Sequence, residues 1–422
     1  MRRFTVLDAV DALANGFTHF SQQWAGQNIE RYDQVVTSTG TGAGRTSLAA
    51  HRFTREQRDP SRGPATGRTT PRFARTLAAL LVASVALAST IAPVALSGAA
   101  ATGAKSAHVT GTGPNLPGTH CPAFPADNVW NTAITDLPVD VNSATWLAAM
   151  DAGTTFLHPD YGPSGDPAQP YGIPWTIVSA RTVFAPVRFL YASESYRGPY
   201  PLSARTPIEG GSDRHALMVD PYRTATSPAC TLFETWDTVY RAHGRSTAGS
   251  GARWNLNSNA LRPAGYTSAD AAGLAILPGL VNYNEVASGS MDHAIRFTAQ
   301  CTQQSYLWPA RHEAGQSDTS CPPMGARFRL NASFTLPASS CSAFCQTVLT
   351  TMKTYGLILA DNGSNWYFQG TADRRWTYND VDQLKAIPAN QFVAVDESCL
   401  MMTPNSGEAL QPGTAAFTQS CG

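Results

Sequence analysis

The stretch PIEGGSDRHALMVD (residues 207–220) joins a tight turn to a short apolar run. Gly210 and Gly211 favour a turn, and the side chain of Asp213 can accept a hydrogen bond from the nearby backbone. The run that follows is typical of a strand. Similar segments, rich in aromatic and β-branched residues and bounded by Gly, Pro, Asn, Asp and Ser, occur at 181–192, 230–240, 293–299, 305–310, 326–334 and 357–362. These patterns predict a mainly β fold.

Helical patterns are fewer than strand patterns, and they occur at 142–153, 267–276, 341–356 and 378–387. Thr267 stands three residues before Asp270, a spacing close to that of a capping box. Gly356 follows an apolar-periodic run, where helices commonly end. We therefore expect a β-sandwich or jelly-roll-like body with a few helical insertions.

The N-terminal quarter of the chain differs from the rest. Residues 45–75 hold eight Arg against two acidic residues and show no apolar periodicity, which is typical of disorder. An apolar run at 77–96 follows Arg72 and Arg75 and precedes small residues, as in a secretory signal. A retained membrane anchor is the alternative, because the run approaches the ~20 residues that a spanning helix needs. We expect an extension that is disordered or a mis-assigned translation start (1–70), a signal peptide (71–104), a linker (105–120), one β-rich domain (121–396) and a disulfide-closed tail (397–422).

All eight cysteines follow the signal segment, and none forms a C-x-x-C motif of the zinc-ribbon or thioredoxin kind. An even number in the exported part suggests up to four disulfides in an oxidising compartment. Proximity in the sequence suggests Cys301–Cys321, Cys341–Cys345 and Cys399–Cys421, which leaves Cys121 with Cys230. We therefore predict a secreted, extracellular protein.

The charge of the exported part excludes some partners. The chain has 30 basic and 30 acidic residues, and residues 1–104 hold 11 and 6 of them, which leaves 19 and 24 and a net charge of −5. A mildly acidic protein offers no electrostatic footprint for nucleic acid or for an anionic membrane. We expect a monomer whose partner is a polysaccharide or oligosaccharide.

Carboxylates and histidines gather beside the strand-like runs. Histidines serve as general acids and bases, and glycoside hydrolysis needs two carboxylates flanking the bond. The candidate catalytic residues are Glu209, Asp213, His215, Asp292, His293 and His312. Glu209 and Asp213 are the candidate acid and base or nucleophile, and the histidines would orient groups or relay protons.

Other polar and aromatic residues near these clusters could contact a glycan, the tryptophans as stacking platforms. The candidate substrate-binding residues are Glu194, Arg214, Trp254, Trp308, Arg311, Asp361 and Trp366. Trp376 is a further candidate platform. Asn362-Gly363 is typical of a type I′ hairpin turn, so Asp361 also fits simple turn chemistry.

Each cluster also has a purely structural interpretation. Asp213 and Asp292 follow glycines and serines as turn residues do, and His312 lies in a loop that a Cys301–Cys321 disulfide would tether. A metal held by His215, His293 and His312 is a further alternative, although no spacing demands it. We expect no cofactor.

Several longer segments together resemble a family of secreted bacterial proteins from actinobacteria and acidobacteria. The segments are FPADNVWNTAITDLPVD, LHPDYG, PIEGGSDRH, SNALRPAGYTSADAAGLAILPGLVNYNEV, DHAIRFT, PARHEAG and ADNGSNWY, which fall within residues 121–396. The resemblance implies an extracellular protein. It carries no assigned reaction and no catalytic residue.

These observations lead to one main hypothesis and one alternative. The main hypothesis is a secreted carbohydrate-active enzyme that hydrolyses an extracellular polysaccharide by carboxylate acid/base chemistry. The alternative is a non-catalytic glycan-binding or cell-surface protein, in which the acidic residues are structural and the tryptophans bind the glycan.

Overall fold

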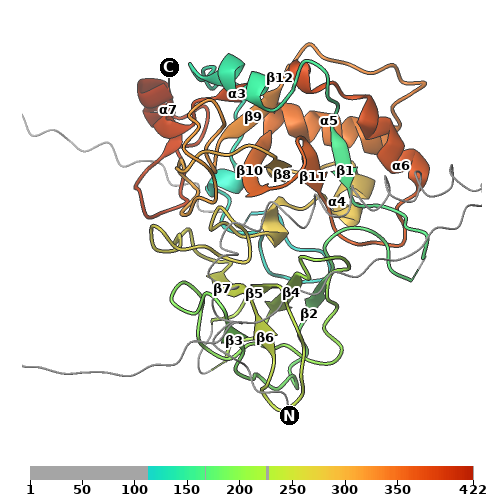
Figure 1. Ribbon diagram of the computed structural model, residues 1–422. Coiled ribbons are helices and arrows are strands. Elements are labelled where there is room, and N and C mark those ends of the chain that lie inside the picture. The colour runs from blue at the N-terminus through green and yellow to red at the C-terminus, as the bar shows by residue number, and fades with distance from the viewer. Residues whose placement is uncertain (1–112, 167, 225–227, 422) are drawn as a thin grey trace, which may run out of the picture. The chain divides into compact units, whose positions relative to one another are not determined.

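The computed structural model describes residues 113–166, 168–224 and 228–421, which belong to one compact unit (Figure 1). The predicted extension and signal peptide, and residues 105–112 of the predicted linker, lie outside the described residues. Within the described part, no helix is long and apolar enough to cross a membrane. Residues 113–120 belong to the folded body rather than to a linker, since Leu116 is buried and its amide donates to the carbonyl of Cys121.

The larger sheet has six strands, which combine parallel and antiparallel pairs. β1 pairs in parallel with β11, and β8 in parallel with β10, while the other neighbours are antiparallel. In spatial order the strands are β1 (His158–Asp160), β11 (Tyr367–Gln369), β8 (Ile295–Ala299), β10 (Leu357–Asn362), β9 (Arg327–Leu330) and β12 (Phe392–Val395). β1 therefore forms one edge of this sheet.

A second sheet has four strands in the order β2 (Trp175–Ile177), β4 (Ala216–Asp220), β5 (Thr231–Trp236) and β7 (Ser250–Asn255). β2 and β4 are parallel, whereas the pairs β4–β5 and β5–β7 are antiparallel. A short parallel pair joins β3 (Arg188–Phe189) to β6 (Thr247–Ala248). Every residue of β4 is buried, so the apolar run that follows His215 is a core strand.

The helices are short. The α-helices are α3 (Ser143–Ala149), α4 (Tyr283–Ser288), α5 (Ala343–Thr354), α6 (Tyr378–Asp382) and α7 (Ala415–Cys421). The 3₁₀ helices are η1 (Val129–Asn131), η2 (Leu277–Gly279), η3 (Gln383–Ala386), η4 (Ala389–Gln391) and η5 (Ser398–Leu400). The helices expected within 142–153 and 341–356 are confirmed as α3 and α5. The helix expected at 378–387 divides into α6 and η3.

The longest helix, α5, follows β9 in the chain, packs against it, and leads directly into β10 (Figure 1). Its first turn is capped by Ser342, whose hydroxyl accepts from the amide of Cys345 at 3.5 Å. It ends before Gly356, whose φ of +71° suits a residue without a side chain.

The helix expected at 267–276 is wrong, because this segment is an irregular loop until η2 begins. The polar side chains bond to the backbone of the loop itself. The hydroxyl of Ser268 donates to the carbonyl of Leu274 at 2.5 Å, and the Asp270 carboxylate accepts from the amide of Ala272 at 2.8 Å. Such local bonds compete with helical ones.

The strand-rich character is confirmed, whereas no sandwich or jelly roll is found among the described residues, whose sheets are open and mixed. Both β4 and β8 are buried along their whole length. Strands covered on both faces are typical of sheets with parallel pairs, while sandwich strands alternate between core and solvent. Short aromatic runs do not distinguish these cases, because they report burial and not the direction of pairing.

All four predicted disulfides are confirmed: Cys121–Cys230, Cys301–Cys321, Cys341–Cys345 and Cys399–Cys421. The C-terminal tail that the last of these closes is bound to the body. The carbonyl of Pro404 accepts from Arg311 at 2.6 Å, and the carbonyl of Gly407 accepts from the amide of Val129 at 2.8 Å. The fold therefore continues past residue 396.

The two faces of β8 have different chemistry. Phe297 stacks on Trp366 with ring centroids 5.6 Å apart, and Phe328 and Phe392 pack edge-on or tilted against the same tryptophan. Because side chains alternate along a strand, Arg296 points to the opposite face. That face carries the polar residues described next.

Candidate functional site

Three polar side chains lie in a row across β1, β11 and β8. Asp160 is opposite Gln369 in the parallel pair of β1 and β11. Phe368 is opposite Phe297 in the antiparallel pair of β11 and β8, so the next position places Gln369 beside Arg296. The guanidinium of Arg296 donates to the side-chain oxygen of Gln369. The strands thus bring together residues that are far apart in the sequence.

Arg296 is fully buried and is held by carboxylates. Its Nη2 lies 2.9 Å from Oδ2 of Asp270 and 3.6 Å from Oδ2 of Asp361. The side chain of Asp270 is itself fully buried. Burial raises the pKa of Asp270 above its usual range, against the opposing charge of Arg296. This network fixes the position of the guanidinium beside Gln369.

The turn at 209–215 places a glutamate against a histidine. Gly211 adopts a φ of +83°, and the amide of Glu209 donates to the carbonyl of His215 at 2.9 Å, which closes the turn. Nδ1 of His215 then lies 2.5 Å from Oε2 of Glu209, and its Nε2 lies 3.1 Å from the carbonyl oxygen of Ala269. The turn therefore has a structural role and also holds a charged pair.

The contacts of His215 indicate a positively charged imidazole. A carbonyl oxygen can only accept, so Nε2 carries a hydrogen, and Nδ1 faces a carboxylate. Burial alone would lower the pKa of His215, but the charge and hydrogen bond of Glu209 raise it to about 9. With both nitrogens engaged, His215 fixes the position of the Glu209 side chain. These contacts give His215 an orienting role toward Glu209, while its expected role in relaying protons stays a prediction.

Asp160 is the last residue of β1 and is exposed as a residue, but protein atoms surround its carboxyl group and shield it from water. Desolvation by the surrounding protein raises the pKa of Asp160 to about 6, with smaller contributions from the charges of Glu209 and Asp213. A hydrogen bond from Gln369 and the charge of Arg296 oppose this rise. A carboxyl with such a pKa is suited to giving up or taking a proton near neutral pH. We name the acid–arginine cluster as Asp160, Glu209, Asp213, His215, Asp270, Arg296, Asp361 and Gln369.

A second pair, His312 and Glu194, contacts the same irregular loop that holds Asp270. Nδ1 of His312 contacts the carbonyl of Ala271 at 2.8 Å, and its Nε2 lies 3.9 Å from Oε2 of Glu194. The same carboxylate oxygen accepts from the amide of Thr267 at 3.1 Å. The loop at 267–272 thus contacts two of the predicted histidines, His215 through Ala269 and His312 through Ala271.

The predicted Asp292–His293 pair has different surroundings. The ring of His293 is buried, with Nε2 3.2 Å from Glu285 of α4 and Nδ1 2.8 Å from the carbonyl of Ala294. Asp292 accepts from the hydroxyl of Ser290 at 2.7 Å in an exposed turn. These contacts place Asp292 and His293 apart from the carboxylates that hold Arg296, and their catalytic role stays a prediction.

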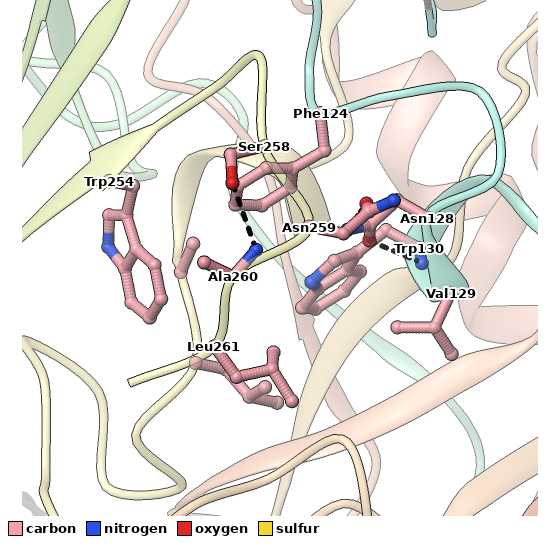
Figure 2. Close-up of a pocket in the computed structure, with 11 residues that line it drawn as sticks. Phe124, Asn128, Val129, Trp130, Trp254, Ser258, Asn259, Ala260 and Leu261 are labelled. Carbon is pink, nitrogen blue, oxygen red and sulfur yellow. Dashed lines mark hydrogen bonds between the residues drawn. The ribbon is translucent and has the colours of Figure 1, made fainter. Parts of the chain in front are cut away.

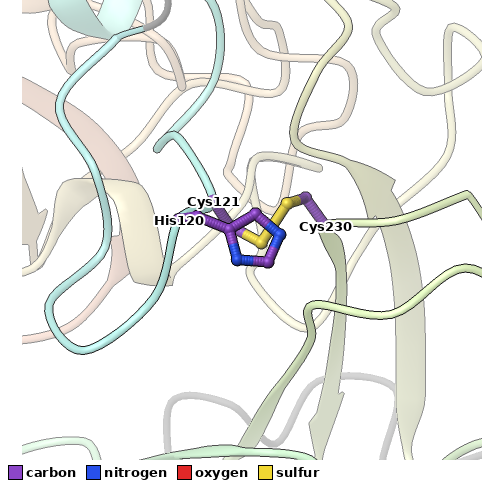
Figure 3. Close-up of side chains that lie close together, drawn as sticks. All are labelled: His120, Cys121 and Cys230. Carbon is purple, nitrogen blue, oxygen red and sulfur yellow. A yellow bond between two sulfur atoms is a disulfide. The ribbon is translucent and has the colours of Figure 1, made fainter.

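The three predicted histidines do not form a metal site. Both ring nitrogens of His215 and of His293 already contact protein oxygens, and each histidine has its own glutamate. Among the described residues, two other groups bring potential ligands together, each around a disulfide: His120 with Cys121 and Cys230 (Figure 3), and Asp318 with Cys301 and Cys321. Zinc binds thiolates, and these sulfur atoms are bonded to each other.

Most of the predicted glycan-binding residues are structural. Trp254 and Trp366 are buried, and their indole nitrogens donate to Glu234 and to the carbonyl of Met150. Trp376 is also buried, so none of these three rings has a free face for a sugar. The partly buried Trp308 donates to the carbonyl of Ser406 at 2.8 Å.

The two predicted arginines also bond to the backbone. Arg311 is buried, and its guanidinium contacts the carbonyl oxygens of Arg262 and Pro404. Arg214 donates to the carbonyl of Thr238 at 2.9 Å. Of the seven predicted substrate-binding residues, Glu194 and Arg311 contact the loop at 267–272, through Thr267 and Ala272. Asp361 faces the same guanidinium as Asp270 of this loop.

A small pocket lies between Phe124, Trp130, Trp254 and Leu261 (Figure 2). The space open to the centre of a water molecule there is about 10 Å³, which suffices for one water. No member of the acid–arginine cluster lines it. This pocket is a packing feature and is too small for a sugar ring.

Sequence reasoning missed four members of the cluster: Asp160, Asp270, Arg296 and Gln369. Asp160 lies in LHPDYG, a segment notable only for the family resemblance, and Asp270 was taken for a capping residue. A signal for Arg296 existed, since an arginine within the apolar run AIRFTA needs a buried partner. Gln369 had no local signal.

The pair of His215 and Glu209 predicts a pH-dependent stability. Since the pKa of His215 is raised from 6.5 to about 9, the stabilisation is complete below pH 6.5 and is lost as the pH rises through about 9. At about 1.4 kcal/mol for each pKa unit, the free energy of unfolding should fall by roughly 3 kcal/mol over this range. Urea unfolding at several pH values checks this.

The control for this prediction is a histidine with an exposed side chain. His215→Gln should remove most of the fall in the free energy of unfolding with rising pH, whereas His120→Gln should leave this fall unchanged. An equal fall in His215→Gln and in the wild type would show that the pair does not stabilise the fold.

The chain matches no protein-family model, no curated protein sequence and no solved structure, so the family resemblance stays a prediction and the cluster itself is the basis for inferring function.

Proposed function

We propose that the protein is a secreted hydrolase that cleaves glycosidic bonds of an extracellular polysaccharide through carboxylate acid/base chemistry. The observation that carries this proposal is the exposed Asp160, with a pKa raised to about 6, near a Glu209 carboxylate that His215 holds. Carboxyl groups whose surroundings favour different protonation states are suited to act as acid and base in one reaction.

The roles follow from these surroundings. Asp160 is the general acid that protonates the leaving oxygen, and Glu209 is the carboxylate that activates water or attacks the sugar. This differs from the expected pair of Glu209 and Asp213. Asp213 is exposed at the turn and acts through its charge on Asp160 and His215.

A polymeric substrate fits the position of Asp160. β1 is an edge strand, and Asp160 is its exposed last residue, so a long chain can approach without entering an enclosed cavity. Exported proteins act on such polymers, and four disulfides are consistent with an oxidising compartment.

The glycan-binding alternative has lost its main support. It depended on aromatic platforms, and Trp254, Trp366 and Trp376 are buried. Retention on a polysaccharide without release of products would still favour it over hydrolysis.

The first test of the proposal is Glu209→Gln. This change removes the carboxylate that serves as base or nucleophile, so release of reducing ends from a polysaccharide panel should fall by at least about 100-fold. The matched control is Glu285→Gln, which alters the other buried histidine–glutamate pair. Similar loss in both variants, or none in Glu209→Gln, would contradict the proposed role of Glu209.

A further inference from the structure

We propose that Gln369 is a positioning residue for Asp160: Arg296 fixes its side-chain amide so that the NH₂ group donates to the Asp160 carboxyl. This inference rests on the proposed function for its catalytic meaning. The contact itself is a property of the fold and can be tested without turnover.

The strand register brings the three side chains together. Asp160 and Gln369 are direct partners in β1 and β11, and Gln369 precedes Arg296 in the row across to β8. Side chains in such a row share one face of the sheet. Their spacing follows from the backbone ladder, so it does not depend on a mobile loop.

The chemistry of Arg296 determines which way the amide of Gln369 points. A guanidinium has donors only, so its contact with Gln369 must be made to the amide oxygen. Asp270 holds the same guanidinium at 2.9 Å, which prevents it from turning away. The amide NH₂ is thereby left free of Arg296, and Asp160 is the direct partner of Gln369 in the register of β1 and β11, so its carboxyl is the acceptor within reach.

This hydrogen bond opposes the other influences on Asp160. Desolvation, Glu209 and Asp213 raise the pKa of Asp160, while the Gln369 bond and Arg296 lower it. Burial and then the charge of Asp160 raise the pKa of Tyr367, which lies two residues before Gln369 on β11. Gln369 thus keeps the pKa of Asp160 from rising further.

The test compares the wild type with Gln369→Met, which keeps the side-chain length and removes the donor. Loss of one hydrogen bond to the charged form should raise the pKa of Asp160 by about 0.5–1 unit. Carbon-detected NMR titration of the Asp160 carboxyl measures this shift directly. The basic limb of the pH–rate profile should move to higher pH by the same number of pH units. Gln346→Met, on the exposed side of α5, is the matched control and should shift neither.

A second variant separates donation from packing. Gln369→Glu keeps an acceptor for Arg296 but replaces the donor with a second carboxylate beside Asp160, so the pKa of Asp160 should rise by more than in Gln369→Met. A purely structural role of Gln369 predicts no shift in either variant, and that result in folded protein would overturn the inference.

The inference and the proposed function can fail separately. If Asp160→Asn leaves turnover unchanged, the proposed function fails, and the NMR titration still decides the inference. If Asp160→Asn abolishes turnover and Gln369→Met moves neither the titration nor the rate profile, the proposed function stands and the inference fails.

Discussion

Asp160→Asn is expected to lower polysaccharide turnover by about 100- to 10,000-fold, the usual contribution of a general acid. Asparagine has nearly the same shape as aspartate and can still contact Gln369, but it cannot transfer a proton to the leaving oxygen. Because Asp160 is exposed at the end of an edge strand, the folded structure should be retained. Reducing-end release, with circular dichroism as a check on folding, measures both outcomes.

The pH dependence of the wild type tests the same role. A general acid must be protonated, so turnover should decline as the pH rises through about 6, where Asp160 loses its proton. Asp292→Asn is the matched control, since that exposed carboxylate contacts Ser290 in a turn and should be dispensable. If Asp160→Asn retains wild-type turnover, or if Asp292→Asn loses as much, Asp160 is not the acid.

Local patterns in the sequence predict the parts of the fold that local interactions determine. The strands β4, β5, β8, β9 and β10 lie within expected segments, and α5 ends before the terminal glycine expected at Gly356. The turn before β4 was predictable from Gly210 and Gly211. Three of the disulfides were predictable because their cysteines are close in the sequence. The fourth was predictable because only Cys121 and Cys230 then remained.

The arrangement of the sheets could not be predicted in the same way. Asn362-Gly363 predicts a hairpin, yet β8 lies between β10 and β11, so these strands are not paired with each other. The order of strands depends on which apolar faces pack together across the whole chain. Turn residues report only the local direction of the backbone.

Part of the candidate site was predictable and part was not. Glu209, Asp213 and His215 could be identified because they stand together in one turn. Asp160, Gln369 and Arg296 come from three strands, and only their register places them on one face. Asp270 precedes its partner Arg296 by 26 residues and lies in a loop that resembled a helix start. Long-range ion pairs of this kind leave no periodic pattern.

Arg296→Met is expected to lower the free energy of unfolding by about 3–5 kcal/mol, because it leaves the buried Asp270 carboxylate without its cation. Methionine fills most of the space, so the loss should reflect charge more than a cavity. The matched control is Arg375→Met, whose exposed pair with Asp373 should contribute no more than about 1 kcal/mol. Urea unfolding measures both variants.

The pH dependence of this loss separates an uncompensated charge from poor packing. Without Arg296, the pKa of Asp270 rises further, since Arg296 is the main group that lowers it. At pH 5 the carboxyl can then bind a proton and remain buried as a neutral group, whereas at pH 8 it must stay charged or lose its burial. The destabilisation by Arg296→Met should therefore be clearly smaller at pH 5 than at pH 8. A loss of equal size at both pH values would mean that Arg296 stabilises the fold by filling space, and that the charge of Asp270 has little part in it.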